Sequence, residues 1–288
     1  MKKLTVLVFS LLTLCSVSGQ DLIERICNSV CTCVDIIENM DSLQKKLDRC
    51  VTESMVIFFE SDEDYISNVD SLKKTVDRVM KSLTYYCPKI KDFILSDKEA
   101  QYYKMSDSEI ANRLYTAGSK SLESKDYKTA KKNLVKAIKA DPAWVLPYDD
   151  LGLVYRQMGD YKKAIKYYSK SLEIYPEGAF AVQNKAVALT YLKDYESALE
   201  NYNMLIDLYP KNPEGYFGKG KTYFLMEDYE NALDYIFYCH KIYSAQNSDY
   251  VKDTKNLVSL IHDKLKDQNK LDIFFKKAET HGITINQN

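Results

Sequence analysis

The order of apolar and polar residues sets the first nineteen positions apart from the rest of the chain. A short basic start, Met1 to Lys3, precedes an apolar run of eleven residues at 4–14 (LTVLVFSLLTL), and small residues follow up to Gly19. Secretory signal peptides have this order of regions, and the run is too short to span a bilayer. The pattern predicts a signal peptide over residues 1–19, cleavage before Gln20, export to the periplasm or the outside, and no transmembrane segment.

Cys15 stands close to the end of this apolar run, where a lipid anchor is conceivable. Lipoprotein signals place Gly, Ala or Ser directly before the lipidated cysteine, and Leu14 stands at that position. We therefore do not expect lipid anchoring through Cys15. A lipid-anchored accessory factor of an outer-membrane assembly or secretion system stays open as an alternative.

Residues 20–96 have apolar positions spaced three and four apart, which predicts helices. Residues 21–40 and 41–59 are two such segments, and a third runs from Asp64 to Tyr86, where Cys87-Pro88 ends it because proline disfavours helix at the preceding residue. The apolar stripe of the first segment consists of Ile23, Ile26, Cys27, Val30, Val34 and Ile37. The pattern predicts a small helical domain over residues 20–96.

Six cysteines follow the signal peptide, and an exported chain favours disulfide bonds among them. We expect Cys33–Cys50 to join two antiparallel neighbours and Cys31–Cys87 to tie in the third helix. A metal site is disfavoured, because the cysteine group at 27–33 has no second half with zinc-ligand spacing. A redox enzyme would need C-x-x-C at a helix start in a strand–helix context. Cys239 fits a small buried side chain in a later helix.

Beyond residue 106 the chain repeats itself every 34 residues. The recurring residues are Ala130, Ala164, Ala198 and Ala232, the dipeptides Asp126-Tyr127, Asp160-Tyr161, Asp194-Tyr195 and Asp228-Tyr229, and Pro142, Pro176 and Pro210. Four units, at 111–144, 145–178, 179–212 and 213–246, form an array over 107–246, in which each unit buries its apolar face against its neighbours. Residues 97–106 are predicted to be a polar linker, and residues 247–288 to be capping helices and a tail.

The second unit carries the repeat signature most fully. It has Leu151-Gly152-x-x-Tyr155, then Ala164-x-x-x-Tyr168, and closes with Pro176. In these residues the array resembles the tetratricopeptide repeat family. The resemblance implies an all-α fold, a right-handed α-solenoid of four helix-turn-helix repeats with capping helices, preceded by the small disulfide-stapled helical domain. It also implies a protein-binding role.

The resemblance further implies that the first helices of the repeats line a concave groove for a peptide or a partner helix. The groove positions are Asn112, Tyr115, Ser119, Leu122, Glu123, Leu146, Asp149, Leu153, Arg156, Gln157, Phe180, Gln183, Val187, Thr190, Tyr191, Glu214, Phe217, Lys221, Phe224 and Leu225. The lysines and asparagines with which the chaperone-binding branch grips a C-terminal carboxylate are replaced by Tyr115, Ser119, Asp150, Phe180 and Asn184. A C-terminal acid is therefore not predicted as ligand. Some of these apolar side chains, Leu153, Val187 and Phe224 especially, could instead pack internally or against the chain's own tail.

Composition removes several classes of function. The net charge of −1 argues against a nucleic-acid binder, and neither G-x-G-x-x-G nor G-x-x-x-x-G-K-[ST] occurs. All three histidines lie after residue 239. We expect no cofactor, no metal and no catalysis. The sequence predicts a non-enzymatic interaction scaffold of the bacterial envelope or secreted fraction, with a thiol or other enzymatic factor that uses the cysteine domain as the alternative.

Overall fold

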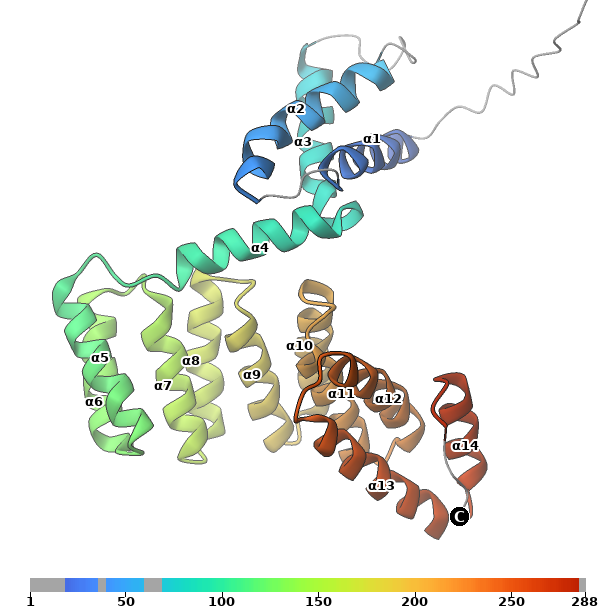
Figure 1. Cartoon of the computed structure of the whole chain (residues 1–288). Helices are drawn as coiled ribbons and strands as arrows, with labels where there is room; N and C mark the ends of the chain where they lie inside the picture. Colours follow the sequence, from blue (N-terminus) through green and yellow to red (C-terminus); the bar gives the residue numbers. More distant parts are fainter. Residues whose placement is uncertain (1–18, 36–39, 60–68, 285–288) are drawn as a thin grey trace, which may run out of the picture. The chain divides into compact units, whose positions relative to one another are not determined.

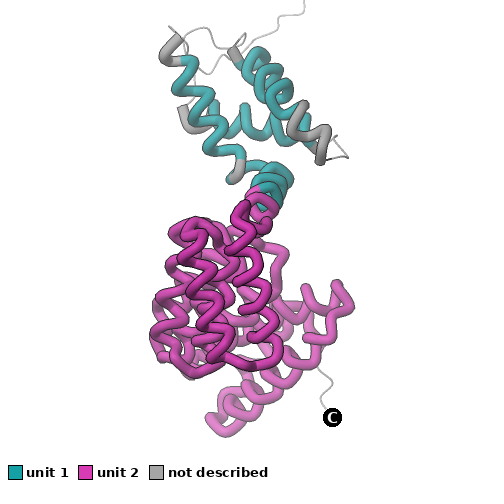
Figure 2. Tube along the Cα trace, turned by 90° about the vertical axis from the view of Figure 1, so that its left-hand side faces the viewer, with its two compact units in different colours: residues 1–97 teal, residues 98–288 magenta. Residues whose placement is uncertain are grey.

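The computed structural model describes residues 19–35, 40–59 and 69–284, and every regular element in these ranges is an α-helix. The chain divides into unit 1, residues 1–97, and unit 2, residues 98–288, which Figure 2 colours separately. The predicted signal peptide lies outside the described residues, apart from Gly19, at which the first helix begins.

Unit 1 contains three helices and most of a fourth. They are α1 (Gly19–Asp35), α2 (Met40–Phe59), α3 (Val69–Tyr86) and α4 (Pro88–Tyr102). The expected apolar stripe faces inward along α1, where Ile26 and Val30 are fully buried with Val79 and Ile90; its last member, Ile37, lies outside the described residues. Two disulfides link these helices: Cys31–Cys87, with a Cα–Cα distance of 5.3 Å, and Cys33–Cys50, with 5.8 Å. These are the two pairs expected from the sequence.

Helix α4 runs on where the sequence suggests a linker. Pro88 suits the first turn of a helix, since its missing N–H has no intrahelical partner there. Neither glycine nor proline follows before Gly118, so nothing interrupts the helix at residue 97. Residues 97–102 are therefore helical and only 103–106 are irregular. The polar residues that suggest a linker equally suit a helix with one exposed face.

Unit 2 is a solenoid of helix pairs that follow one another along the chain (Figure 1). The four pairs are α5 (Glu109–Glu123) with α6 (Tyr127–Ala140), α7 (Val145–Gln157) with α8 (Tyr161–Ile174), α9 (Ala179–Tyr191) with α10 (Tyr195–Leu208), and α11 (Pro213–Leu225) with α12 (Tyr229–Ala245). Within each pair the two helices pack on each other, and the second helix also packs on the first helix of the next pair.

The recurring Asp-Tyr dipeptide starts every second helix. Each aspartate is the N-cap, and its side chain accepts a hydrogen bond from the backbone N–H three residues on: Asp126 from Thr129, Asp160 from Lys163, Asp194 from Ser197 and Asp228 from Asn231. The cap satisfies a backbone donor that the first helical turn leaves without a partner. The residue before each aspartate has a positive φ, which turns the chain from one helix into the next.

Small residues allow the paired helices to come close. A Cβ on Gly152 would lie 2.6 Å from Cε1 of Tyr168, whose ring is fully buried. Alanines 130, 164, 198 and 232 are likewise fully buried. Period-34 positions therefore hold either a small residue or the large side chain that packs on it, which is Leu134, Tyr168, Tyr202 or Ile236, so some of the tyrosines are part of the scaffold.

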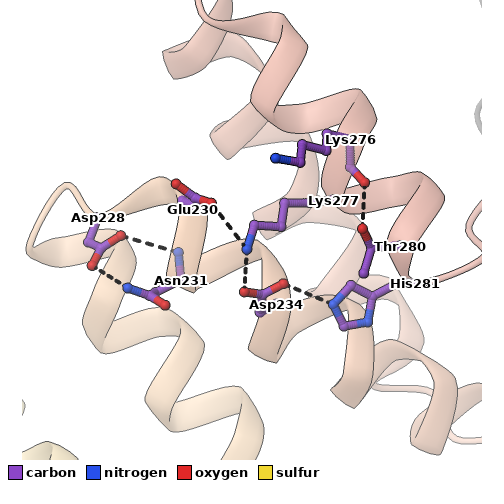
Figure 3. A network of polar contacts seen from close by, with 8 residues as sticks. All are labelled: Asp228, Glu230, Asn231, Asp234, Lys276, Lys277, Thr280 and His281. Atoms are coloured by element: carbon purple, nitrogen blue, oxygen red, sulfur yellow. Dashed lines mark hydrogen bonds and ion pairs between the residues drawn. The ribbon is translucent and has the colours of Figure 1, made fainter.

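Two further helices, α13 (Val251–Asp267) and α14 (Leu271–Thr280), cover the last repeat. Helix α13 presents Leu257, Ile261 and Leu265 to the apolar cluster that includes Phe237 of α12. Helix α14 is held on α12 by polar contacts (Figure 3), in which Nζ of Lys277 lies 2.6 Å from Asp234 and 3.3 Å from Glu230. The capping role expected for residues after 246 fits these contacts.

Candidate protein-interaction surface

The first helices of the repeats lie next to one another and form one side of the array. Helices α5 and α7, α7 and α9, and α9 and α11 are in contact, and α13 extends the row beyond α11. We call the surface made by these helices the first-helix face. Three hollows open on it: two lie between neighbouring first helices, and the third lies between α11 and the capping helix α13.

The α5–α7 hollow has a volume of about 520 Å³. Its lining consists of Ser119, Leu122, Glu123, Lys125, Tyr127, Asp150, Leu153 and Gln157. Five of these are groove positions expected from the sequence, and Asp150 directly follows another. Lys125, the turn residue, and Tyr127, the first residue of α6, complete the wall.

The α9–α11 hollow has a volume of about 320 Å³. Its lining consists of Val187, Thr190, Tyr191, Lys193, Tyr195, Tyr202, Gly218, Lys221 and Leu225. Every residue of the α5–α7 lining has its counterpart here 68 residues later, which is two repeat lengths. The two hollows thus occupy equivalent positions of the array, two repeats apart.

The position halfway between them is closed by aromatic side chains. Tyr191 of α9 stacks on Tyr161 at the start of α8, with ring centroids 4.7 Å apart and an interplanar angle of 1°. Tyr161 is the counterpart of Tyr127 and Tyr195, so its partner ring covers the space that stays open in the neighbouring positions. The face of the array therefore alternates between an open hollow, a stacked pair and a second open hollow.

A third opening, the α11–α13 hollow, has a volume of about 260 Å³ and is lined by Gln183, Glu214, Phe217, Tyr243, Tyr250 and Asp253. Its polar groups bind one another: Nε2 of Gln183 donates to Glu214 at 3.1 Å, and the hydroxyl of Tyr243 donates to the other carboxylate oxygen of Glu214. Gln183, Glu214 and Phe217 are groove positions that the sequence predicts.

The remaining expected groove residues line none of these hollows. Tyr115 packs edge-on against Trp144, Phe224 lies against the ring of Tyr229, and Phe180 lies edge-on to Tyr168. Leu146 and Arg156 are half-buried between the repeats. For Phe224 the internal packing that the sequence left open is what the structure shows.

Asp149 and Asn112 bind residues 98–106, which the sequence predicts to be a polar linker. The hydroxyl of Tyr103 donates to Asp149 at 2.9 Å, and Nδ2 of Asn112 donates to the backbone oxygen of Ser106 at 2.7 Å. Asp149 is only 2% exposed, so it is not accessible to a partner. The indole N–H of Trp144 donates to the carbonyl of Lys104 at 2.9 Å.

The rest of this segment adds an aromatic contact and two polar ones. Tyr102 stacks on Tyr175 at 4.7 Å, Lys98 pairs with Glu177, and Ser106 donates to Asp141. Residues 98–106 thus belong to the array and pack along its first and second repeats. The signal in the sequence is the aromatic pair at 102–103, which a solvated linker does not need.

Burial changes the acid–base properties of two neighbouring carboxyl groups. It raises the pKa of Asp149 to about 7, against the effect of the hydroxyls of Ser171 and Tyr103, which lower it. It also raises the pKa of Asp150 to about 6, while Ser119 and Tyr115 lower it and the charge of Glu123 raises it further. In the described part of the chain neither carboxylate forms an ion pair with a lysine or arginine.

Each cysteine in the described residues is either disulfide-bonded or buried. The redox alternative required a free thiol at Cys31 or Cys33, and both are disulfide-bonded. The two described cysteines without a disulfide, Cys27 and Cys239, are buried, and burial raises the pKa of the Cys27 thiol to about 11. No group of three or more His, Cys, Asp or Glu in the described ranges is placed to hold a metal ion. None of the described helices is long and apolar enough to cross a membrane.

Comparison with known proteins bears on the array. Residues 150–177 match the family described as tetratricopeptide repeat, and residues 186–227 match the family described as TPR repeat. No curated protein matches the sequence. Among solved structures, MamA (residue 41 to the end) from Desulfovibrio magneticus RS-1 is 18% identical, covers 60% of this chain and 96% of its own, and has a TM-score of 0.50.

Two other similar structures cover less of the chain. The first TPR of Spaghetti (RPAP3), bound to an HSP90 peptide, is 21% identical, covers 42% of this chain and 96% of its own, and has a TM-score of 0.41. The Sgt2 TPR domain from Aspergillus fumigatus is 20% identical, covers 43% and 84%, and has a TM-score of 0.40. With its 34-residue period, its capped helix pairs and its family matches, this chain is a tetratricopeptide-repeat protein, and such repeats are in general protein–protein interaction modules.

Proposed function

We propose that this protein is a non-enzymatic scaffold that binds a segment of a partner protein along its first-helix face. The observation that carries the proposal is the pair of hollows at repeat-related positions, with a third hollow farther along the same face. An extended peptide or a helix that crosses the array places successive side chains at regular intervals, and two hollows at equivalent positions match that arrangement.

Exposed apolar groups on this face supply a reason for binding. Tyr191 is 57% exposed and Leu225 is 43% exposed, and both line the α9–α11 hollow. Contact with a partner would remove this apolar surface from water, at about 25 cal/mol for each Å². Binding sites of this kind combine a mainly apolar lining with a few polar groups that fix orientation, such as Lys221 and Thr190 here.

The proposal is tested by two matched tyrosine substitutions. Tyr191 and Tyr238 are both exposed, by 57% and 45%, and each ring lies against another tyrosine, Tyr161 at 4.7 Å and Tyr216 at 4.5 Å. Only Tyr191 lies on the first-helix face, since Tyr238 belongs to α12, a second helix. Affinity capture from envelope extract, followed by mass spectrometry, should recover a partner with the wild type and Tyr238→Ala.

Tyr191→Ala should recover at least fivefold less of that partner while its thermal unfolding stays within a few degrees of the wild type. Equal recovery by both variants would place the binding surface elsewhere. Loss of capture by Tyr238→Ala alone would assign it to the second helices.

We further propose that the protein is exported to the periplasm or the extracellular space of a bacterium. The signal-peptide pattern at 1–19 supports this, and so do two disulfides, which persist in oxidising compartments. Intact mass of the protein from cell fractions tests it. A chain that starts at Gln20 is expected in the exported fraction. Retention of residues 1–19 on a cytosolic chain contradicts export, and added acyl mass at Cys15 identifies the lipid-anchored alternative.

A further inference from the structure

The α5–α7 and α9–α11 hollows occupy the same position of the array but differ in their side chains. Asp150 in the first corresponds to Gly218 in the second, and Glu123 corresponds to Tyr191. At Gly218 a Cβ would lie 2.1 Å from Cε1 of Tyr202, so the tyrosine ring takes up the space beside the backbone there. The replacement turns a polar wall into an aromatic one.

The charges of the two hollows are opposite in sign at their walls. Glu123 and Asp150 line the α5–α7 hollow, and its only lysine among the lining residues, Lys125, lies on the exposed turn. Oδ2 of Asp150 is buried and has no hydrogen-bond partner among the described residues. In the α9–α11 hollow the ionic residues are Lys193 and Lys221, without an acidic residue in the lining.

A half-buried carboxylate without a counter-charge is a strong attractor for a cation. Its interaction with a positive charge is screened less than at the open surface, and Ser119 and Tyr115 offset only part of its desolvation. A lysine or arginine side chain that enters the hollow beside Asp150 would supply the counter-charge that this carboxylate lacks. The hollow is open enough, at about 520 Å³, to admit such a side chain.

The separation of the hollows sets the spacing of the ligand. Helices in contact lie about 10 Å apart, so two steps along the row of first helices amount to about 20 Å. An extended chain advances about 3.3 Å for each residue, which gives about six residues between the two hollows. The stacked Tyr191 and Tyr161 between them offer a flat surface for the intervening residues.

We propose that the partner segment carries an aromatic or large aliphatic side chain that fills the α9–α11 hollow, and a lysine or arginine about six residues away that enters the α5–α7 hollow. This inference rests on the proposed function, because it specifies the segment that the first-helix face binds. The charges fix how the segment lies on the array, since Lys193 and Lys221 repel its cation from the second hollow.

Selection from a library of random 12-residue peptides displayed on phage tests the proposal with the full chain. Selected peptides should be enriched in pairs of one basic and one large apolar residue separated by five to seven positions. The best peptide is then synthesised with a fluorescent label, and its Kd is measured by anisotropy.

Two pairs of variants separate the two contacts. Asp150→Asn should weaken the peptide about tenfold, whereas Asp149→Asn, the same change at the neighbouring carboxylate that Tyr103 covers, should leave its Kd within twofold. Leu225→Ala should weaken it about fivefold, whereas Met226→Ala, at 41% exposure but outside the lining, should not. Replacing the basic residue of the peptide by glutamine should weaken its binding to the wild type and not to Asp150→Asn.

The outcomes distinguish this inference from the proposed function. Peptides that lack the basic–apolar pair, yet lose affinity for Leu225→Ala or Tyr191→Ala, would overturn the inference and leave the first-helix face as the binding surface. Selected peptides whose affinity no variant of that face changes would overturn both. Equal effects of Asp150→Asn and Asp149→Asn would also overturn the inference, because only Asp150 lines the hollow.

Discussion

Unit 1 and unit 2 are both made of helices, but the helices are held together in different ways. In unit 1 two disulfides connect α1 with α2 and with the residue between α3 and α4. In unit 2 a buried small residue and a ring recur every 34 residues, and the only described cysteine, Cys239, is unpaired. A small helical domain buries too little surface to be secure by packing alone, whereas each added repeat adds another interface.

The difference implies that the two units respond to different conditions. Unit 1 should be sensitive to reduction, because its links are covalent. Unit 2 should be sensitive to pH and to small changes of side-chain volume, because it contains a buried carboxyl group and closely packed helices. Four predictions test this contrast, in order of decreasing effect.

The largest effect is expected from removing the disulfides of unit 1. Cross-links that close loops of 56 and 17 residues restrict the unfolded chain, which gives about 4 kcal/mol for Cys31–Cys87 and about 3 kcal/mol for Cys33–Cys50. Replacing each pair by alanines should lower the free energy of unfolding of unit 1, and the loss should be larger for Cys31–Cys87 than for Cys33–Cys50. Hydrogen exchange by mass spectrometry on the full chain in urea separates the two units. Equal loss of protection in 98–288 would contradict the contrast.

In unit 2 the buried carboxyl group of Asp149 should make stability depend on pH. Burial raises its pKa from 3.8 to about 7, so the folded state holds a proton that the unfolded state releases between these values. The contribution of Asp149 to stability is therefore largest below pH 4 and falls as the pH rises to about 7, by on the order of 2–4 kcal/mol. Asp149→Asn should be more stable than the wild type by that amount at pH 8 and similar to it at pH 4.

The measurement is urea unfolding of both proteins from pH 4 to pH 8, followed by exchange in residues 98–288. Glu177→Gln serves as a control, since this carboxylate is paired with Lys98 at the surface of the array. A constant difference between Asp149→Asn and the wild type at all pH values would show that Asp149 does not titrate in this range.

At Gly152, close packing and helix propensity predict stability changes of opposite sign for substitution by alanine. Glycine to alanine inside an exposed helix stabilises a protein by about 0.5–1 kcal/mol. Here the added Cβ would lie 2.6 Å from the buried Tyr168 ring, so Gly152→Ala should destabilise unit 2 by about 1–3 kcal/mol. Ala186→Gly, at the same position of the next repeat, is the control and should cost about 1 kcal/mol. A more stable Gly152→Ala would show that the ring can move aside.

The sequence predicts those structural features whose residues recur with the repeat period better than features that occur only once. The Asp-Tyr dipeptides and the alanines recur in register, so helix pairs, turns and caps follow from them. The disulfide pairs follow because Cys33 and Cys50 fall on adjacent helices of a short domain. Residues 97–106 occur once and have no apolar stripe, so their helix and their contacts with Asp149 and Trp144 depend on tertiary packing.

The candidate surface is predicted only in part for the same reason. Groove positions follow from the repeat register, and thirteen of the twenty expected residues line a hollow. Whether a given position is open depends on the side chain opposite. Tyr191 closes one position by stacking on Tyr161, and Tyr103 covers Asp149, and neither pairing is encoded by a period.

The smallest effect tests whether residues 98–106 belong to the array. Tyr103→Phe removes the hydroxyl that donates to Asp149 at 2.9 Å and leaves the buried carboxyl group without that partner. The loss should lower the free energy of unfolding of unit 2 by about 1 kcal/mol. The effect should be larger at pH 8 than at pH 5, because hydrogen bonds to a charged carboxylate are stronger. Tyr102→Phe keeps the ring that stacks on Tyr175 and should change stability by less than about 0.5 kcal/mol. Urea unfolding at both pH values measures the two variants. If neither substitution changed the stability to urea, residues 98–106 would behave as the linker that their polarity suggests. Their backbone amides would then exchange rapidly, as expected of a linker.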